Sequence, residues 1–172
     1  VTADHGEGFG EHGIPRDRRH GYHLYADQTK VPLILRLPGL DRAEGQGPRV
    51  IDEPVGHVDL LPTLLNLLGA REGDEPQLLG RSLVPLLLPD ARPAAPPYRV
   101  FQEVMYEGPT TRKALVATAE GRLWHYVRNV IPDDTSELYD LQADPREERD
   151  QQGSPSARAA EGAFAQTLSA WM

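Results

Sequence analysis

The apolar residues of this chain follow a helical period in two places. In residues 60–68, leucines recur at i, i+3, i+4 and i+7, which is the spacing of a helix with one apolar face. Asp59 is well placed to cap the start of this helix, and Gly69 ends it. A second helical stripe, in residues 160–171, closes the chain and includes two aromatic side chains. Such a stripe is more often part of a core than of a cofactor site, so we expect both helices to pack against a sheet.

Other apolar runs have the composition of strands. Residues 31–37 are almost continuously apolar, which is typical of a strand buried on both faces. Four strand-like runs follow later in the chain: residues 99–106, 112–118, 122–128 and 136–141. Only Ala119-Glu120-Gly121 separates the second run from the third, and this linker is short enough for an antiparallel hairpin.

These elements predict an α/β protein with two regions. We expect residues 1–92 to form the end of an α/β domain, in which helices cover a sheet. Residues 93–172 are expected to form a small antiparallel sheet with a closing helix. The proline-rich residues 93–97 would act as a stiff connector between the two regions.

Composition excludes several classes of function. The chain carries 18 Lys and Arg against 26 Asp and Glu, a formal net charge of −8, and it has no basic block. Nucleic acid is therefore not an expected partner. The absence of cysteine rules out disulfides and thiolate metal sites within these residues. No stretch reaches the roughly 18 apolar residues that span a bilayer.

The candidate chemistry lies at the beginning of the chain. Asp4 and His5 stand side by side at the end of a short strand-like run, and four glycines follow in residues 6–13. A hard carboxylate oxygen beside an imidazole nitrogen is a plausible ligand pair for a divalent cation. The alternative is a polar loop in which Asp4 caps a turn and His5 is merely exposed.

The longer string of motifs resembles the C-terminal portion of the sulfatase family, within the alkaline phosphatase superfamily. The resemblance covers most of the chain and its landmarks occur in the usual order. They are Asp4-His5-Gly6-Glu7-Gly8-Phe9-Gly10-Glu11-His12-Gly13, His20-Gly21-x-x-Leu24-Tyr25, Val31-Pro32-Leu33-Ile34, His57-Val58-Asp59-Leu60-Leu61-Pro62-Thr63, Leu79-Gly80-Arg81-Ser82 and Glu137-Leu138-Tyr139-Asp140-Leu141 with Asp144-Pro145.

The resemblance implies a site that binds an anionic ester substrate. Asp4 and His5 would be metal ligands, with calcium usual in sulfatases and zinc or manganese expected in relatives that hydrolyse phosphoesters. His20 matches the position that contacts the sulfate or the leaving oxygen, so it would bind the anion or donate a proton. Glu7 and His12 would hydrogen-bond to the ligands. His23 is a nearby alternative to His20.

One departure from the family pattern is large. Sulfatases convert a Cys or Ser in a Cys/Ser-x-Pro-x-Arg motif to formylglycine, and neither Ser82 nor Ser154 begins such a motif. We therefore expect the chain to be the C-terminal part of a metal-dependent sulfatase-like hydrolase, with formylglycine supplied by a missing N-terminal half. Alone it would be inactive, with a partial metal site.

Two alternatives remain open. The parent could be a phosphoesterase, a phosphonate hydrolase or a phosphoethanolamine transferase of the same superfamily. The chain could instead be a non-catalytic domain that binds an anion or a protein. An incomplete sheet would also expose apolar surface, so self-association is expected. The resemblance to sulfatases also implies a periplasmic, secreted or membrane-anchored protein, because those are the usual locations of the family.

Overall fold

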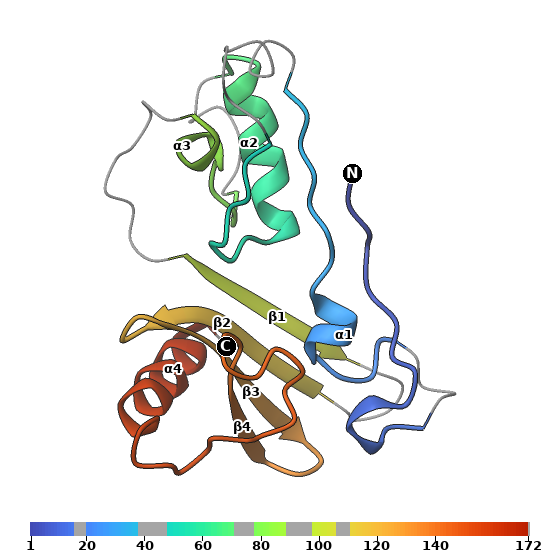
Figure 1. The fold of residues 1–172 in the computed structure, drawn as a ribbon, viewed down its shortest axis with the longest axis vertical. Coiled ribbons are helices and arrows are strands. Elements are labelled where there is room, and N and C mark those ends of the chain that lie inside the picture. Colours follow the sequence, from blue (N-terminus) through green and yellow to red (C-terminus); the bar gives the residue numbers. More distant parts are fainter. Residues whose placement is uncertain (16–19, 38–47, 71–77, 89–97, 106–110, 172) are drawn as a thin grey trace. The chain divides into compact units, whose positions relative to one another are not determined.

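The computed structural model describes residues 1–15, 20–37, 48–70, 78–88, 98–105 and 111–171. The chain forms two compact units, one made of Val1–Arg49 and Phe101–Met172 and the other of Val50–Val100 (Figure 1). No helix in the described ranges is both long and apolar enough to cross a membrane.

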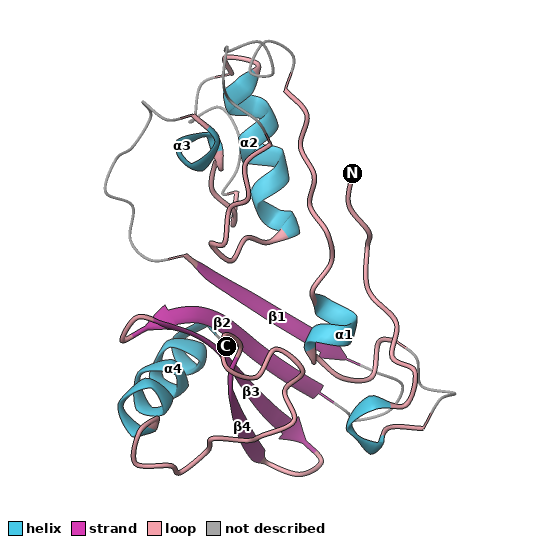
Figure 2. Cartoon of the chain, viewed as in Figure 1, coloured by secondary structure: helices cyan, strands magenta, loops and turns pink. Residues whose placement is uncertain are grey.

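The first unit is built around a four-stranded sheet with the order β1-β2-β3-β4 (Figure 2). The strands are β1 (Arg99–Met105), β2 (Thr111–Ala119), β3 (Arg122–Ile131) and β4 (Thr135–Asp140). The β2–β3 and β3–β4 pairs are antiparallel. A two-residue turn joins β2 to β3, and both its residues, Glu120 and Gly121, have positive φ. This is the turn geometry that matches the twist of a hairpin, so the predicted hairpin is confirmed.

The helix α4 (Arg158–Trp171) packs on one face of this sheet (Figure 1). Its inward side chains Ala160, Phe164 and Leu168 are buried in one apolar cluster with side chains of β2, β3 and β4. Trp171 extends the contact by stacking on Phe101, with 5.0 Å between the ring centroids. Burying a Phe or Leu side chain stabilises a fold by about 1.5–3 kcal/mol, so this stripe holds helix and sheet together, as its period predicts.

The second unit contains the short turn η3 (His57–Asp59), the helix α2 (Leu60–Leu67) and the short helix α3 (Val84–Leu87). The predicted helix is confirmed, but the predicted cap is not, because the Asp59 side chain makes no capping bond to α2. Its carboxylate instead accepts hydrogen bonds from the backbone N–H groups of Gly56 and Arg81, each at 2.9 Å. Asp59 therefore ties the chain before α2 to a segment that follows it by about twenty residues.

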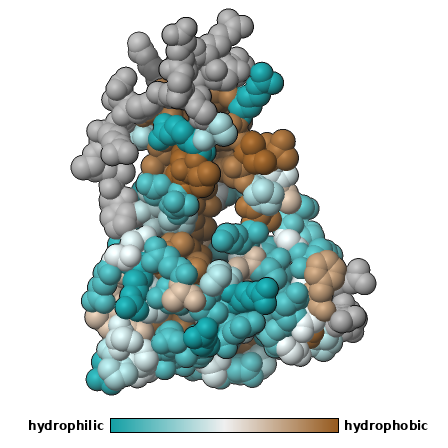
Figure 3. All heavy atoms as spheres, viewed as in Figure 1, coloured by the Kyte–Doolittle hydropathy of each residue, from teal (hydrophilic) through white to brown (hydrophobic). Residues whose placement is uncertain are grey.

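The expected burial of the apolar face of α2 is not found in the described structure. Leu61, Leu64 and Leu68 are 53%, 54% and 82% exposed, and Figure 3 shows apolar surface in this part of the molecule. The buried residues of α2 are Pro62 and Thr63. The helical period locates an apolar face correctly, but burial requires a partner surface, and no described element covers this one.

The expected strand at residues 31–37 is also not formed. Its only ladder contact in the described chain is an antiparallel bridge between Leu33 and Thr2, and Ile34 is 62% exposed. An apolar run becomes a buried strand only where neighbouring strands pair with it on both sides. Here the bridge to Thr2 is the one pairing, and it leads directly to Asp4 and His5.

Candidate functional site

The first two residues of the chain pair with residues 33–34 in a short antiparallel contact. The backbone N–H of Ile34 donates to Val1 O at 2.8 Å, next to the Thr2–Leu33 bridge. Beyond this contact, the Gly6 N–H donates to Gln28 O at 2.7 Å in the helix α1 (Ala26–Thr29). A Cβ atom on residue 6 would lie only 2.0 Å from Asp27 O. Glycine is therefore required here by close backbone approach, and the same contact fixes the chain between His5 and Glu7.

Three side chains converge around this glycine. The possible ligand atoms of His5, Glu7 and His20 all lie within 4.8 Å of one another. His20 Nδ1 is 2.6 Å from Glu7 Oε1, and the His5 and His20 rings are 4.4 Å apart. His5 and His20 are exposed and Glu7 is half-buried, so the group is open to solvent. Two nitrogens and an oxygen at this spacing can share one divalent cation.

Asp4 lies beside this cluster. Its Oδ2 is 3.6 Å from His5 Nε2, and its Oδ1 accepts a hydrogen bond from the His5 N–H at 3.0 Å. That backbone hydrogen bond lowers the pKa of Asp4, while the Gly6 carbonyl raises the pKa of His5. The Asp4 side chain is 89% exposed and its carboxylate is free to approach a cation or an adjoining surface.

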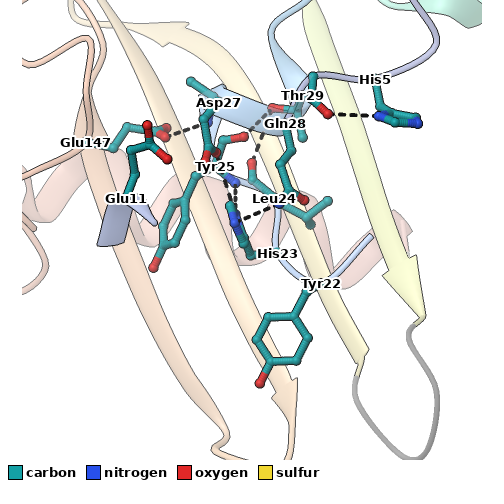
Figure 4. A network of polar contacts seen from close by, with 12 residues as sticks. His5, Glu11, Tyr22, His23, Leu24, Tyr25, Asp27, Gln28, Thr29 and Glu147 are labelled. Carbon is teal, nitrogen blue, oxygen red and sulfur yellow. Dashed lines mark hydrogen bonds and ion pairs between the residues drawn. The ribbon is translucent and has the colours of Figure 1, made fainter. Parts of the chain in front are cut away.

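The other two predicted candidates occupy different surroundings. The His12 ring stacks on Tyr25 at 3.9 Å and does not belong to the His5–Glu7–His20 group. His23 is buried beside α1, where its Nε2 is 2.8 Å from the Gln28 side-chain nitrogen (Figure 4). Burial lowers the pKa of His23 to about 4, so this ring is neutral at neutral pH. Of His20 and His23, only His20 is open to an anion.

Asp27 is close to Lys30 in the chain, but it is not a solvent-exposed residue. Its carboxylate is largely buried and lies 3.7 Å from His23 Nδ1. Burial is also the main reason that the pKa of Asp27 is raised. Asp27 therefore belongs to the interior beneath α1.

Two carboxylates, one on β4 and one in the loop that follows β4, also reach α1 and Tyr25 before it, and sequence reasoning did not find this role for either. The Tyr25 hydroxyl donates to Glu137 Oε2 at 2.6 Å. The Ala26 N–H donates to Glu147 Oε2 at 2.7 Å (Figure 4). Glu137 begins the Glu137-Leu138-Tyr139-Asp140-Leu141 motif and Glu147 follows Asp144-Pro145. The presence of this motif was the only sign in the sequence that these residues matter. Nothing in the motif indicates a contact with residues more than 100 positions earlier in the chain.

Comparisons with known proteins match this chain to sulfatases over most of its length. The sequence profile of the family described as "N-sulphoglucosamine sulphohydrolase, C-terminal" matches residues 10–171. A choline-sulfatase of Rhizobium meliloti is 32% identical over 84% of this chain and 25% of its own length. An N-acetylglucosamine-6-O-sulfatase of Bacteroides thetaiotaomicron is 31% identical over 85% of this chain and 25% of its own length.

Solved structures extend the agreement to the fold. A putative sulfatase from Bacteroides thetaiotaomicron superimposes with a TM-score of 0.70 at 26% identity, over 99% of this chain and 34% of that one. The phosphonate monoester hydrolase of Agrobacterium radiobacter gives a TM-score of 0.69 at 24% identity, over 98% and 33%. This chain thus spans about a quarter of the length of these curated relatives and about a third of the solved chains.

Proposed function

Because this chain belongs to the sulfatase family of the alkaline phosphatase superfamily, as the C-terminal part of such a protein, we propose that the parent hydrolyses sulfate esters. We propose further that residues 4–20 of this chain supply part of its active site. The observation that carries the proposal is the convergence of His5, Glu7 and His20, with their ligand atoms within 4.8 Å of one another.

His20 is the proposed contact to the ester. Glu7 Oε1 accepts a hydrogen bond from His20 Nδ1–H at 2.6 Å, which fixes the plane of the ring. The Nε2–H is then directed away from Glu7, where it can bind a sulfate oxygen. A proton held at this atom can pass to the leaving oxygen as the ester bond breaks. Glu7 thus orients His20 and takes no proton itself.

Asp4 and His5 are the proposed ligands of a divalent cation, and a carboxylate oxygen of Glu7 lies within 4.8 Å of a ring nitrogen of His5. When bound, the cation would neutralise negative charge that develops on the ester oxygens. Calcium is the expected ion in a sulfatase. The nucleophile, expected as formylglycine, would come from a part of the protein outside these residues, so we expect this chain to be inactive alone.

A phosphoesterase or phosphonate hydrolase is the second candidate, and the donor set favours it. Calcium is usually bound by oxygen atoms alone, whereas imidazole suits zinc better. His5 offers a nitrogen at the metal position, and His20 offers a second nitrogen nearby. A parent that prefers zinc or manganese and aryl phosphate would fit this alternative.

The test is an assay of the full-length protein with aryl sulfate, aryl phosphate and aryl phosphonate esters. We expect metal-dependent turnover that falls at least 100-fold in Asp4→Ala and in His20→Ala, since removing one electrostatic contact to a transition state costs about 10²–10³ in rate. Asp134→Ala, which removes an exposed carboxylate bonded to Arg128, is the control and should retain full activity. Turnover indifferent to both active-site changes would refute the proposal and leave a non-catalytic anion-binding domain.

A further inference from the structure

The helix α1 is too short to be stable by itself. It has four residues, Ala26–Thr29, and the side chain of its N-cap residue, Tyr25, makes no capping bond. A single helical turn is unfavourable in isolation because ordering its backbone costs more than its few hydrogen bonds return. Its first N–H group, on Ala26, is bonded instead by Glu147, which lies 121 residues further along the chain. The stability of α1 therefore depends on the C-terminal sheet.

Glu147 is itself held rigidly. Its side chain is fully buried, and Oε1 is 2.5 Å from Nδ1 of the buried His125 on β3. The other ring nitrogen of His125 lies 3.1 Å from Gln102 Oε1 on β1. Because both oxygens of Glu147 have partners, one on the sheet and one on α1, the carboxylate acts as a fixed bridge between them.

Glu137, on β4, forms a second bridge. Besides the Tyr25 hydroxyl, it accepts hydrogen bonds from the Tyr139 hydroxyl at 2.5 Å and from Asn129 Nδ2 at 2.6 Å. Burial opposes the charged form, but these donors together lower the pKa of Glu137. A charged carboxylate makes stronger hydrogen bonds than a neutral acid, so Tyr25 is held firmly at the start of α1.

The opposite end of α1 is in contact with the His5–Glu7–His20 cluster. Gln28 O accepts the Gly6 N–H at 2.7 Å, and no space for a Cβ atom remains between residue 6 and the helix. His5 and Glu7 flank Gly6 in the chain, and His20 lies six residues before Ala26. A shift of α1 would therefore move both sides of the cluster.

We propose that Glu137 and Glu147 are positioning residues for the candidate site. Through Tyr25 and Ala26 they fix α1, and through Gly6 the helix fixes the separation of His5, Glu7 and His20. The effect on catalysis rests on the proposed function, but the effect on the geometry does not, and it can be measured without turnover.

The test compares two carboxylates of the same segment. Glu147→Ala removes the acceptor of the Ala26 N–H, whereas Asp150→Ala removes an acceptor of the Leu138 N–H on β4, at 2.9 Å. Hydrogen exchange of the Gly6 amide and the NMR shifts of the His5 and His20 rings report the cluster. Exchange of the Val127 amide on β3 reports the sheet.

We expect Glu147→Ala to speed exchange at Gly6 about 10-fold or more relative to Val127 and to shift both ring signals, because the first N–H of α1 loses its acceptor. Asp150→Ala should leave this ratio and the rings unchanged even if it lowers overall stability. Tyr25→Phe, which removes only the hydroxyl bound to Glu137, should act in the same direction as Glu147→Ala and keeps the test open if that variant does not fold.

Gly6 exchange and ring shifts that stay at wild-type values in both α1 variants would overturn the proposal. So would an equal change in Asp150→Ala, because the effect would then be one of general stability. If the full-length protein hydrolyses aryl sulfate, kcat should fall in Glu147→Ala by about the same factor by which protection of the Gly6 amide from exchange falls. KM should change little. A parent that hydrolyses no ester would refute the proposed function and leave the exchange result to decide this inference alone.

Discussion

Replacing Gly6 by alanine is the sharpest test of how the opening loop is built. The new Cβ would lie 2.0 Å from Asp27 O and 3.0 Å from the Asp27 carbonyl carbon, both backbone atoms that cannot rotate away. The loop must therefore separate from α1, and the 2.7 Å hydrogen bond from Gly6 N to Gln28 O must lengthen or break. His5 and Glu7 would move with the loop, away from His20.

The size of the effect follows from three contributions. Overpacking costs about 1–3 kcal/mol. A lost backbone hydrogen bond costs about 0.5–1.5 kcal/mol. Replacing glycine lowers the entropy of the unfolded chain, which offsets about 0.4–1 kcal/mol. We expect Gly6→Ala to destabilise the contact between loop and helix by roughly 0.5–4 kcal/mol, from the sum of these effects.

The same substitution elsewhere in the chain provides the control. Gly162 lies inside α4, and a Cβ there would meet no atom within 4 Å. Gly162→Ala should stabilise the protein by about 0.5–1 kcal/mol, because alanine is the better helix former. Urea unfolding followed by circular dichroism, with Gly6 amide exchange for the local contact, measures both variants. If Gly6→Ala behaves like Gly162→Ala in both measurements, the argument from close approach is wrong.

Three further predictions concern stability and association. The unfolded chain protonates His23 near pH 6.5 but the folded chain only near pH 4, so the free energy of unfolding should fall by about 2–3 kcal/mol as pH drops through this window, and a His23→Asn variant should lose that slope in urea titrations at pH 7 and pH 4.5. Asp59→Ala strands two backbone N–H groups and should cost about 2–4 kcal/mol, measured by the loss of amide protection at Arg81 relative to Leu138. The exposed leucines of α2 should make the isolated chain self-associate, and a monodisperse monomer in light scattering would contradict this.

The sequence predicted those parts of the fold whose partners lie nearby in the chain. The β2–β3 hairpin needs only a two-residue turn, and α4 packs on strands within about fifty residues of it. The α/β class and the sulfatase resemblance are confirmed by the relatives and by the solved structures. The predictions of a buried strand at residues 31–37 and of a buried leucine face on α2 were wrong. An apolar pattern shows which residues can be buried but not which surface covers them.

For the candidate site, too, the sequence predicted the contacts between residues that are close in the chain and not the distant ones. His5, Glu7 and His20 lie within sixteen residues, and a motif of that length could indicate that they meet. The metal and anion roles given to Asp4, His5 and His20 remain predictions. The support from Glu137 and Glu147 could not be read from the sequence, because hydrogen bonds over 112 and 121 residues leave no local period.

The long reach from Ala26 to Glu147 also bears on how the protein is made. A ribosome adds about 5–20 residues per second, so roughly 6–24 seconds separate the synthesis of α1 from that of the carboxylate that holds it. Throughout that interval His5, Glu7 and His20 have already been synthesised, but the hydrogen bond between Ala26 and Glu147 that helps to order them has not formed. Contacts of such high sequence separation form late and slowly. His5, Glu7 and His20 are thus translated well before Glu147 and are among the last of these residues to reach their final geometry.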